Sequence, residues 1–272
     1  MKHLKLSIFF LFLAFFSQTG FGQMTLSFTI NDVSCNGGSD GSITVHVDGG
    51  VPPYTYTWST LDVFTTADTF SIISGLPAGT TYWVQVTDSD IPENGAFSPL
   101  LTVNEPLPLS IDSENKTDIT CNGVNDGTIT ITASGGNPPY EYSIDGGSNF
   151  FANGGNFSGL AGGIYPVVVR DSKNCSTSGS SLTIVDPPGI TIASQIPVDI
   201  SCNGLTDGTI TITASGGTPP YQYSIDGGAN FLANGGIFTG LSAGDYDIAV
   251  RDFNLCAKNG ATLTIVEPPL LV

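Results

Sequence analysis

The chain has little positive charge, and this scarcity limits the partners that it can bind. It contains seven Lys and Arg residues against 24 Asp and Glu residues. Two of the lysines lie in the first five residues, so the part after residue 22 keeps five basic residues and has a formal charge of −19. A surface of this sign repels phosphate backbones and anionic lipid headgroups. We therefore expect no nucleic-acid partner.

Long apolar runs are missing after the N-terminus. Leu6–Phe16 is an apolar run of eleven residues that follows two lysines, and the small residues Gly20 and Gly22 precede Gln23. This run is too short to span a bilayer. The arrangement predicts a cleaved secretory signal peptide over residues 1–22. We expect an exported mature chain that does not insert into the membrane.

Histidine is almost absent, which argues against catalysis. The part after residue 22 contains one histidine, His46, which lies between two valines on the predicted outward face of a strand. No Ser/His/Asp or Cys/His arrangement can be built around it. The glycine-rich turns lack the lysine and the following helix of a phosphate-binding loop. The sequence therefore predicts a protein that is not an enzyme and has no organic cofactor.

The abundant feature of the chain is repetition. Equivalent cysteines, Cys35, Cys121 and Cys202, are separated by 86 and then 81 residues, and similar sequences follow each of them. A period of this length indicates an array of domains, each with its own core. We predict repeat domains at residues 23–106, 107–188 and 189–269, and the start of a linker to a further unit at residues 270–272.

Each repeat alternates apolar and polar residues in short stretches separated by Gly, Pro, Asn and Asp. Ile129 and Ile131 alternate with threonines, and no stretch has a sustained helical period. This pattern predicts half-buried antiparallel strands. About seven short strands in about 80 residues predict an immunoglobulin-like β-sandwich. The chain is thus expected to be all-β, with three such sandwiches in tandem.

Four aromatic residues are predicted to have structural roles. In each repeat a Leu, a Gly and then a Tyr precede a Val-rich strand, which resembles the tyrosine corner of immunoglobulin-like domains. We expect the rings of these tyrosines to pack inward and their hydroxyls to bond upstream backbone; they are Tyr82, Tyr165 and Tyr246. Trp58 replaces Ile144 and Ile225 on an inward face and is predicted to lie in the core. Pro166 lies beside one corner, where we expect strand pairing not to have begun.

Several motifs occur in the same order along the chain and resemble those of the SprB repeat. They are C-N-G-x-x-D-G-[ST]-I-T, G-G-x-P-P-Y-x-Y and G-L-x-A-G-x-Y, and together they span Asp32–Pro269. The SprB repeat is named for a very large surface adhesin of gliding bacteria, and its module is likened to PKD-like, immunoglobulin-type domains. The resemblance implies export, surface display, an adhesin or filament role in gliding motility, and no catalytic residues.

Five cysteines in an exported chain predict disulfides, but their pairing is open. Pairing within repeats would join Cys121 to Cys175 and Cys202 to Cys256. In a sandwich these cysteines belong to opposite poles, about 20 Å apart at ~3.3 Å per residue. A disulfide tolerates Cα atoms only about 4.4–6.8 Å apart.

Pairing between consecutive repeats is the hypothesis that we favour. The hypothesis assumes that the pole where the chain leaves one repeat abuts the pole where it enters the next repeat. Cys35 then pairs with Cys175, and Cys121 pairs with Cys256. Cys202 then stays unpaired in this chain. This arrangement explains why the first repeat lacks the second cysteine of the other two. Free thiols are the remaining alternative, and stapled repeats would form a stiff rod.

Two ligand sites remain as weaker hypotheses. Asp40, Asp126 and Asp207 recur in the same turn, and oxygen-rich turns suit calcium. The same residues favour turns without any metal, because their side chains bond nearby backbone. Trp83 is predicted to point outward, where its ring could stack on a sugar.

We therefore expect a non-enzymatic, secreted segment of the bacterial cell surface, an adhesin or stalk that presents or spaces binding surfaces. The extracellular ligand, a polysaccharide or a protein, is not indicated by the sequence. The alternative is a carbohydrate-binding module array attached to a larger secreted enzyme. A calcium-stiffened stalk would share the same fold.

Overall fold

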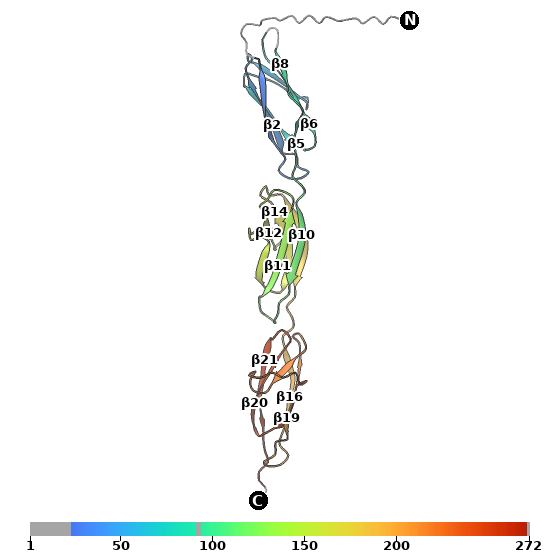
Figure 1. Cartoon of the computed structure of the whole chain (residues 1–272), viewed down its shortest axis with the longest axis vertical. Helices are drawn as coiled ribbons and strands as arrows, with labels where there is room; N and C mark the ends of the chain where they lie inside the picture. The colour runs from blue at the N-terminus through green and yellow to red at the C-terminus, as the bar shows by residue number, and fades with distance from the viewer. Residues whose placement is uncertain (1–22, 91–93, 271–272) are drawn as a thin grey trace, which may run out of the picture. The chain divides into compact units, whose positions relative to one another are not determined.

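The computed structural model describes residues 23–90 and 94–270. The predicted signal peptide, residues 1–22, lies outside the described residues, as do the last two residues of the predicted linker start. Within the described ranges all regular secondary structure is β-strand (Figure 1). These residues contain no helix that could cross a membrane.

The hydrophobic core is divided into three. The chain separates into one unit that ends at Leu107 and a second that begins at Pro108. The first unit has a single core, which includes Trp58 and Tyr56. The second unit has two separate cores, one built around Ile129 and Ile131 and the other around Ile210 and Ile212. Each predicted repeat therefore contains its own core.

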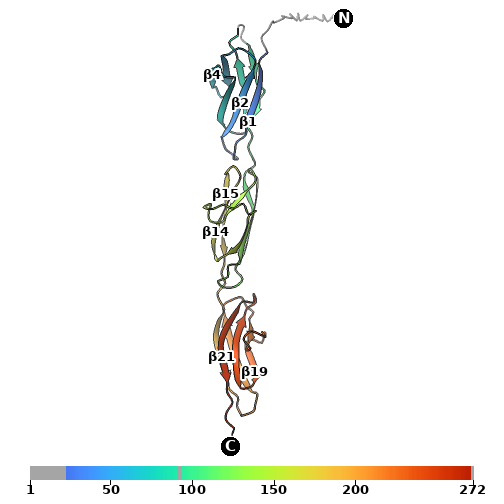
Figure 2. The ribbon, with the colours of Figure 1, turned by 90° about the vertical axis from the view of Figure 1, so that its left-hand side faces the viewer.

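The second repeat is a sandwich of two antiparallel sheets, each with three strands. One sheet has the order β10-β11-β13, and the other has the order β12-β14-β15. The strands are β10 (Ser110–Thr117), β11 (Gly127–Ser134), β13 (Asn156–Leu160), β12 (Glu141–Ser143), β14 (Gly163–Arg170) and β15 (Ser176–Ile184). Figure 1 shows β10 beside β11, and Figure 2 shows β14 beside β15.

The third repeat has the same topology. Its sheets have the orders β16-β17-β19 and β18-β20-β21. The strands are β16 (Thr191–Val198), β17 (Gly208–Ser215), β19 (Ile237–Leu241), β18 (Gln222–Ser224), β20 (Gly244–Arg251) and β21 (Ala257–Ile265).

The predicted alternation along the strands places the cores. Ile129 and Ile131 in β11 are fully buried, whereas Thr130 between them and Thr132 after them are exposed. Burial of one such side chain stabilises the fold by about 1.5–3 kcal/mol. The all-β prediction and the immunoglobulin-like sandwich are therefore confirmed by the sheets themselves.

The first repeat differs at one edge. Its sheets have the orders β1-β2-β5 and β4-β3-β7-β8, and a short pair joins β6 to β9. The strands are β1 (Thr25–Asn31), β2 (Gly41–Asp48), β3 (Tyr54–Trp58), β4 (Val63–Thr66), β5 (Phe70–Leu76), β6 (Thr81–Tyr82), β7 (Val84–Thr87), β8 (Gly95–Phe97) and β9 (Leu101–Thr102).

The expectation of seven strands per repeat is wrong for the second and third repeats, which have six each. The missing strand corresponds to β4, which pairs with β3 in the first repeat. In the second repeat a glycine-rich loop takes its place and makes a single bridge, Tyr142 to Phe151. Four glycines of this loop have positive φ, a conformation that a regular strand does not contain.

The expectation for Pro166 is also wrong. β14 already pairs with β15 at this residue, opposite Ser181. On the other side of β14, pairing with β12 begins only at Val168. The Pro166 carbonyl faces that side and accepts a hydrogen bond from the Gly146 N–H at 3.0 Å. The missing donor of proline therefore costs no ladder bond.

Candidate functional site

The turn that contains each first cysteine is held by an aspartate. The Asp126 carboxylate accepts hydrogen bonds from the Thr120 hydroxyl and from the Thr120 N–H, and those bonds lower the pKa of Asp126. Asp207 accepts the same two bonds from Ser201 and has a lowered pKa for the same reason. Asp40 accepts from the Ser34 N–H at 2.9 Å. These three carboxylates therefore have a structural role in their turns.

Calcium binding by these aspartates stays a prediction. Each of the three carboxylates bonds a residue six positions earlier in its own turn. Among the described residues no three His, Cys, Asp or Glu side chains gather in a geometry that could hold a metal ion.

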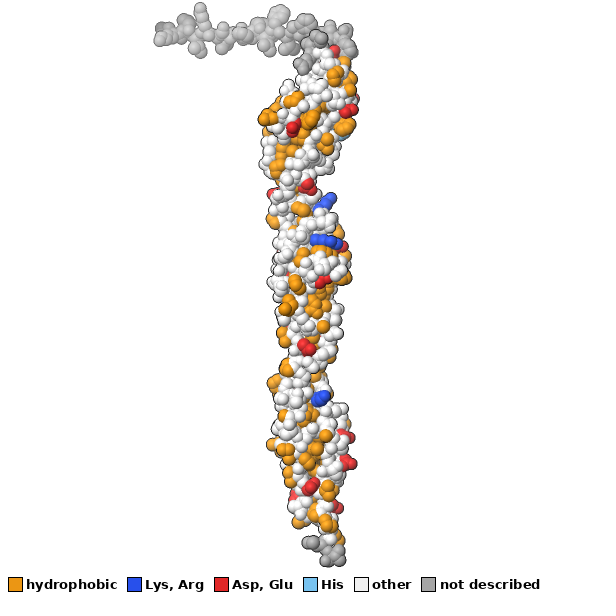
Figure 3. Space-filling view, turned by 180° about the vertical axis from the view of Figure 1, so that it is seen from behind, with side chains coloured by type: hydrophobic (Ala, Val, Ile, Leu, Met, Phe, Trp, Pro, Cys, Tyr) orange, Lys and Arg blue, Asp and Glu red, His pale blue; other side chains and the backbone are white. Residues whose placement is uncertain are grey.

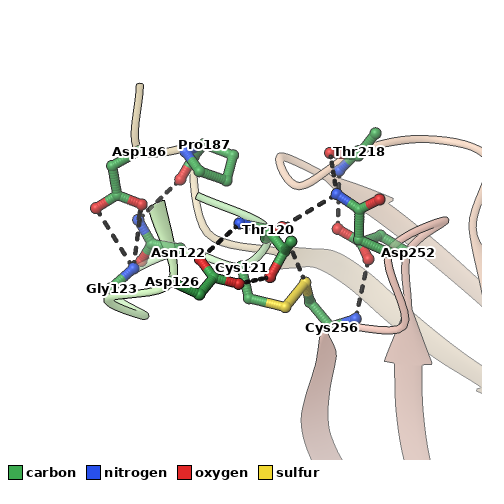
Figure 4. Close-up of a disulfide and its surroundings, with 11 residues drawn as sticks. Thr120, Cys121, Asn122, Gly123, Asp126, Asp186, Pro187, Thr218, Asp252 and Cys256 are labelled. Carbon is green, nitrogen blue, oxygen red and sulfur yellow. Dashed lines mark hydrogen bonds between the residues drawn. A yellow bond between two sulfur atoms is a disulfide. The ribbon is translucent and has the colours of Figure 1, made fainter. Parts of the chain in front are cut away.

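The same turn binds the segment that leaves its own repeat. Asn122 Nδ2 donates to the Pro187 carbonyl at 2.9 Å, and the Gly123 N–H donates to Asp186 Oδ1 at 3.1 Å (Figure 4). We call this pair of contacts the exit clasp. Equivalent clasps join Asn36 and Gly37 to Pro106 and Glu105, and Asn203 and Gly204 to Pro268 and Glu267. The clasp fixes the direction in which the chain leaves each sandwich.

A disulfide links the second and third repeats. Cys121, in the exit turn of the second repeat, bonds Cys256, which precedes β21 of the third, and their Cα atoms are 5.6 Å apart (Figure 4). Beside it, Asn254 Nδ2 donates to the Thr120 carbonyl at 3.1 Å and to Thr218 Oγ1 at 3.3 Å. The disulfide and the hydrogen bond from Asn254 to Thr120 therefore both cross the junction between the second and third repeats.

Asp252 holds the cysteine turn of the third repeat in place. Its side chain is 3% exposed, and its carboxylate accepts hydrogen bonds from the Cys256 N–H at 3.0 Å and the Thr218 N–H at 2.9 Å. The neighbouring Gly217 N–H donates to the Pro188 carbonyl of the linker at 2.6 Å. The disulfide and the linker are thus anchored to one loop.

A glycine is required where the linker crosses that loop. Gly216 has a φ of 74°, and a Cβ atom there would lie 2.2 Å from the Gly189 carbonyl oxygen. Both the backbone conformation and the close approach exclude a larger residue.

The cysteines are distributed as follows. The structure joins Cys121 to Cys256, the pair that stacking of consecutive repeats predicts, and not to Cys175. Cys202 is free and exposed. Cys35 and Cys175 are each disulfide-bonded. Their pairing with one another stays a prediction.

Leu255 occupies a strained position in the turn before Cys256. Its φ is 65° and its side chain is 66% exposed. Left-handed backbone costs such a residue about 1–2 kcal/mol. Asn174 holds the equivalent position of the second repeat, also with a φ of 65°, and asparagine tolerates this region better.

We expect Leu255→Asn to raise the free energy of unfolding of the third repeat by about 0.5–1 kcal/mol, because it relieves this strain. The measurement is guanidinium denaturation followed by circular dichroism. The reciprocal variant Asn174→Leu should lower the stability of the second repeat by a similar amount. Unchanged midpoints in both variants would contradict the assignment of strain.

The predicted structural aromatics lie as follows. Each corner tyrosine donates its hydroxyl to an upstream carbonyl: Tyr82 to Pro77 at 3.1 Å, Tyr165 to Ala161 at 2.9 Å and Tyr246 to Ser242 at 2.9 Å. The Tyr82 ring is buried, but the other two rings are only half-buried. Trp58 is fully buried, and its Nε1 donates to Ser71 Oγ at 3.2 Å.

Trp83 is half-buried, and its ring stacks on that of Phe97, with centroids 5.1 Å apart and planes inclined by 24°. One face of the indole is therefore covered by the chain's own side chain. Sugar stacking on Trp83 stays an untested prediction. His46 lies outward beside Phe70, with ring centroids 6.2 Å apart.

Sequence reasoning missed a buried aspartate that directly follows the Val-rich strand of each repeat, after β7, β14 and β20. Asp171 is 3% exposed; burial opposes its ionisation, but hydrogen bonds from Asn137, Lys173 and Cys175 outweigh this effect and lower its pKa. Asp252 is its equivalent in the third repeat, and Asp88 in the first. Recurrence of Asp after each Val-rich strand was the available signal.

Three consecutive β-sandwiches, two of them joined by a disulfide, identify the chain as a tandem array of immunoglobulin-like domains. The family model of the SprB repeat matches residues 27–63, 113–149 and 194–230. The chain therefore contains three SprB repeats, one in each sandwich. No curated protein matches it.

Several solved structures are similar to the chain at low identity. The FN1–FN3 domains of chicken CNTN1 are 12% identical, with a TM-score of 0.30, and the match covers 89% of this chain and 98% of theirs. Extracellular domains 3–5 of Drosophila OTK are 13% identical, with a TM-score of 0.34 and coverages of 85% and 92%. A 282-residue C-terminal fragment of intimin, solved with the intimin-binding domain of its translocated receptor, is 18% identical, with a TM-score of 0.31 and coverages of 64% and 67%.

Proposed function

We propose that this chain is an exported, surface-displayed segment of an adhesin or stalk, whose repeats space and present binding surfaces without catalysis. The observation that carries the proposal is the disulfide between Cys121 and Cys256. Disulfides persist in oxidising compartments outside the cytoplasm. A covalent link between domains, rather than within one, serves to fix the spacing of neighbours.

The hydrogen bonds at this junction support a mechanical role. Asn254 donates to the Thr120 carbonyl of the preceding repeat, and Gly217 donates to the linker at Pro188. These bonds and the disulfide together restrict rotation of the third repeat about its linker. We propose an equivalent link between Cys35 and Cys175.

The surface charge fits an extracellular role. Figure 3 shows few Lys or Arg side chains on the face in view, with Asp and Glu scattered among uncharged side chains. The chain has only two arginines, Arg170 and Arg251, and each lies over a phenylalanine ring. A nucleic-acid partner would need a basic surface, so we propose a polysaccharide or protein partner instead.

Export and cross-linking are tested together by expressing the full chain in a bacterial host that secretes it. We expect a mature N-terminus at Gln23 and labelling by a thiol reagent at Cys202 alone. Non-reducing peptide mapping should recover a Cys121–Cys256 peptide and a Cys35–Cys175 peptide. Retention in the cytoplasm with all five thiols reactive, or recovery of a Cys121–Cys175 peptide, would contradict the proposal.

A further inference from the structure

A polar cleft lies on the outer face of the β12-β14-β15 sheet in the second repeat. Its volume is about 420 Å³. Arg170 from β14 and Ser176 and Ser178 from β15 form its floor, because these residues are paired or adjacent in the register of the two strands. Gly147 and Phe150 from the loop after β12, and Asn174 from the turn before β15, also line the cleft.

The floor of this cleft is held in place from within. Arg170 Nε donates to Glu141 Oε2 at 2.6 Å, and the guanidinium carbon lies 4.1 Å from the centroid of the Phe150 ring. The ion pair and the ring fix the guanidinium plane. Both terminal Nη groups remain available as donors, since no described residue accepts a hydrogen bond from them.

The other polar side chains of the cleft are equally available. The side-chain amide of Asn174 and the Ser176 and Ser178 hydroxyls have no hydrogen-bond partner among the described residues. Between them, Val168 and Phe150 supply half-buried apolar surface. Amide, hydroxyl and guanidinium groups around a small apolar strip match a ligand with many hydroxyls and a C–H face.

We propose that this cleft binds a neutral saccharide. Glu141 neutralises Arg170, and the chain carries a large negative charge, so an acidic saccharide would be repelled. The inference goes beyond the proposed spacing function and does not depend on it. It also does not involve Trp83, which belongs to the first repeat.

The third repeat provides a natural contrast. Its arginine is arranged in the same way: Arg251 lies 4.4 Å from the Phe231 ring centroid, and its Nε donates to Gln222 at 2.7 Å. However, Leu255 and Ala257 stand in the places of Asn174 and Ser176. Two of the four polar groups are therefore lost, and we expect the third repeat not to bind the saccharide.

The experiment titrates the full oxidised chain with neutral oligosaccharides of glucose, galactose and mannose, and separately with polygalacturonate. Binding is measured by calorimetry and by NMR shifts of the amides between residues 174 and 178. At least one neutral oligosaccharide should bind, with an affinity that is insensitive to salt. Ser176→Ala with Ser178→Ala should weaken this binding by about tenfold or more, because both hydroxyl contacts are lost.

The control is Asn259→Ala, the position in the third repeat that corresponds to Ser178, and it should leave binding unchanged. The variant Leu255→Asn with Ala257→Ser should add a second binding site. The proposal is overturned if no neutral oligosaccharide binds, if only polygalacturonate binds, or if the double serine variant binds as tightly as the wild type. Because both serines are exposed, their replacement leaves the fold intact, so loss of binding is not a folding effect.

Discussion

Replacement of both Cys121 and Cys256 by serine is expected to lower the free energy of unfolding of the second and third repeats by about 2–5 kcal/mol. The two cysteines are 135 residues apart in the sequence. A cross-link across so long a segment removes much of the conformational freedom of the unfolded chain. Substitution at both positions avoids a new free thiol.

The chain offers its own spectroscopic control for this experiment. Both tryptophans, Trp58 and Trp83, belong to the first repeat, so tryptophan fluorescence reports on that repeat alone. Circular dichroism reports on all three. The double variant should shift the dichroism transition in guanidinium and leave the fluorescence transition in place. The control is Cys202→Ser, which removes an exposed free thiol and should change neither the dichroism nor the fluorescence transition. Equal dichroism transitions for the double variant and the wild type would show that the disulfide does not stabilise the fold.

Asp171→Ala is expected to destabilise the second repeat by about 3 kcal/mol or more. The Asp171 carboxylate accepts hydrogen bonds from the Asn137 N–H at 2.8 Å, the Lys173 N–H at 2.8 Å and the Cys175 N–H at 3.0 Å. Alanine would leave these donors without their acceptor inside the fold, and each buried unsatisfied group costs about 1–3 kcal/mol. Asp171→Asn keeps one carbonyl acceptor and should lose less.

The same aspartate predicts a dependence on pH. Hydrogen bonds hold the pKa of Asp171 below its ordinary value of 3.8 in the folded state, although burial opposes this. Its contribution to stability is therefore complete above the unfolded pKa and disappears as the pH falls through the lower, folded pKa. Urea denaturation between pH 5 and about pH 2 should show a steeper loss for the wild type than for Asp171→Asn. Parallel losses in the two proteins would show that Asp171 is not the group responsible.

The sequence was sufficient to predict what depends on local periodicity. Alternation around Ile129 and Ile131 identified the strands and the inward faces, and the Leu-Gly-Tyr pattern placed the hydroxyl bonds of Tyr165 and Tyr246. The half-buried rings of those two tyrosines were not predicted. The burial of these rings depends on how closely the two sheets of the sandwich pack against each other. The sequence pattern of a single strand does not determine that distance.

Contacts between distant segments were the part that sequence reasoning missed. The exit clasp joins Asn122 to Pro187, 65 residues away, and Asp171 joins Asn137 across 34 residues. Neither distance follows from a strand period or a turn type. The strand count failed for a related reason, since a glycine-rich loop replaces a strand where positive φ angles exclude regular pairing. Cys121 and Cys256 were predicted because the position of each pole constrained them.

The exit clasp and the disulfide differ in one respect that bears on how such arrays change length. Each clasp is contained in a single repeat, so one duplicated gene segment carries a complete clasp with it. The disulfide needs one cysteine from each of two neighbours, always in the same order along the chain. Unequal recombination that adds or deletes a whole repeat therefore preserves every clasp and restores a matched cysteine pair at each new junction. Selection should therefore tolerate changes in the number of whole repeats. It should not tolerate the deletion of part of a repeat, which separates the residues of a clasp or of a cysteine pair.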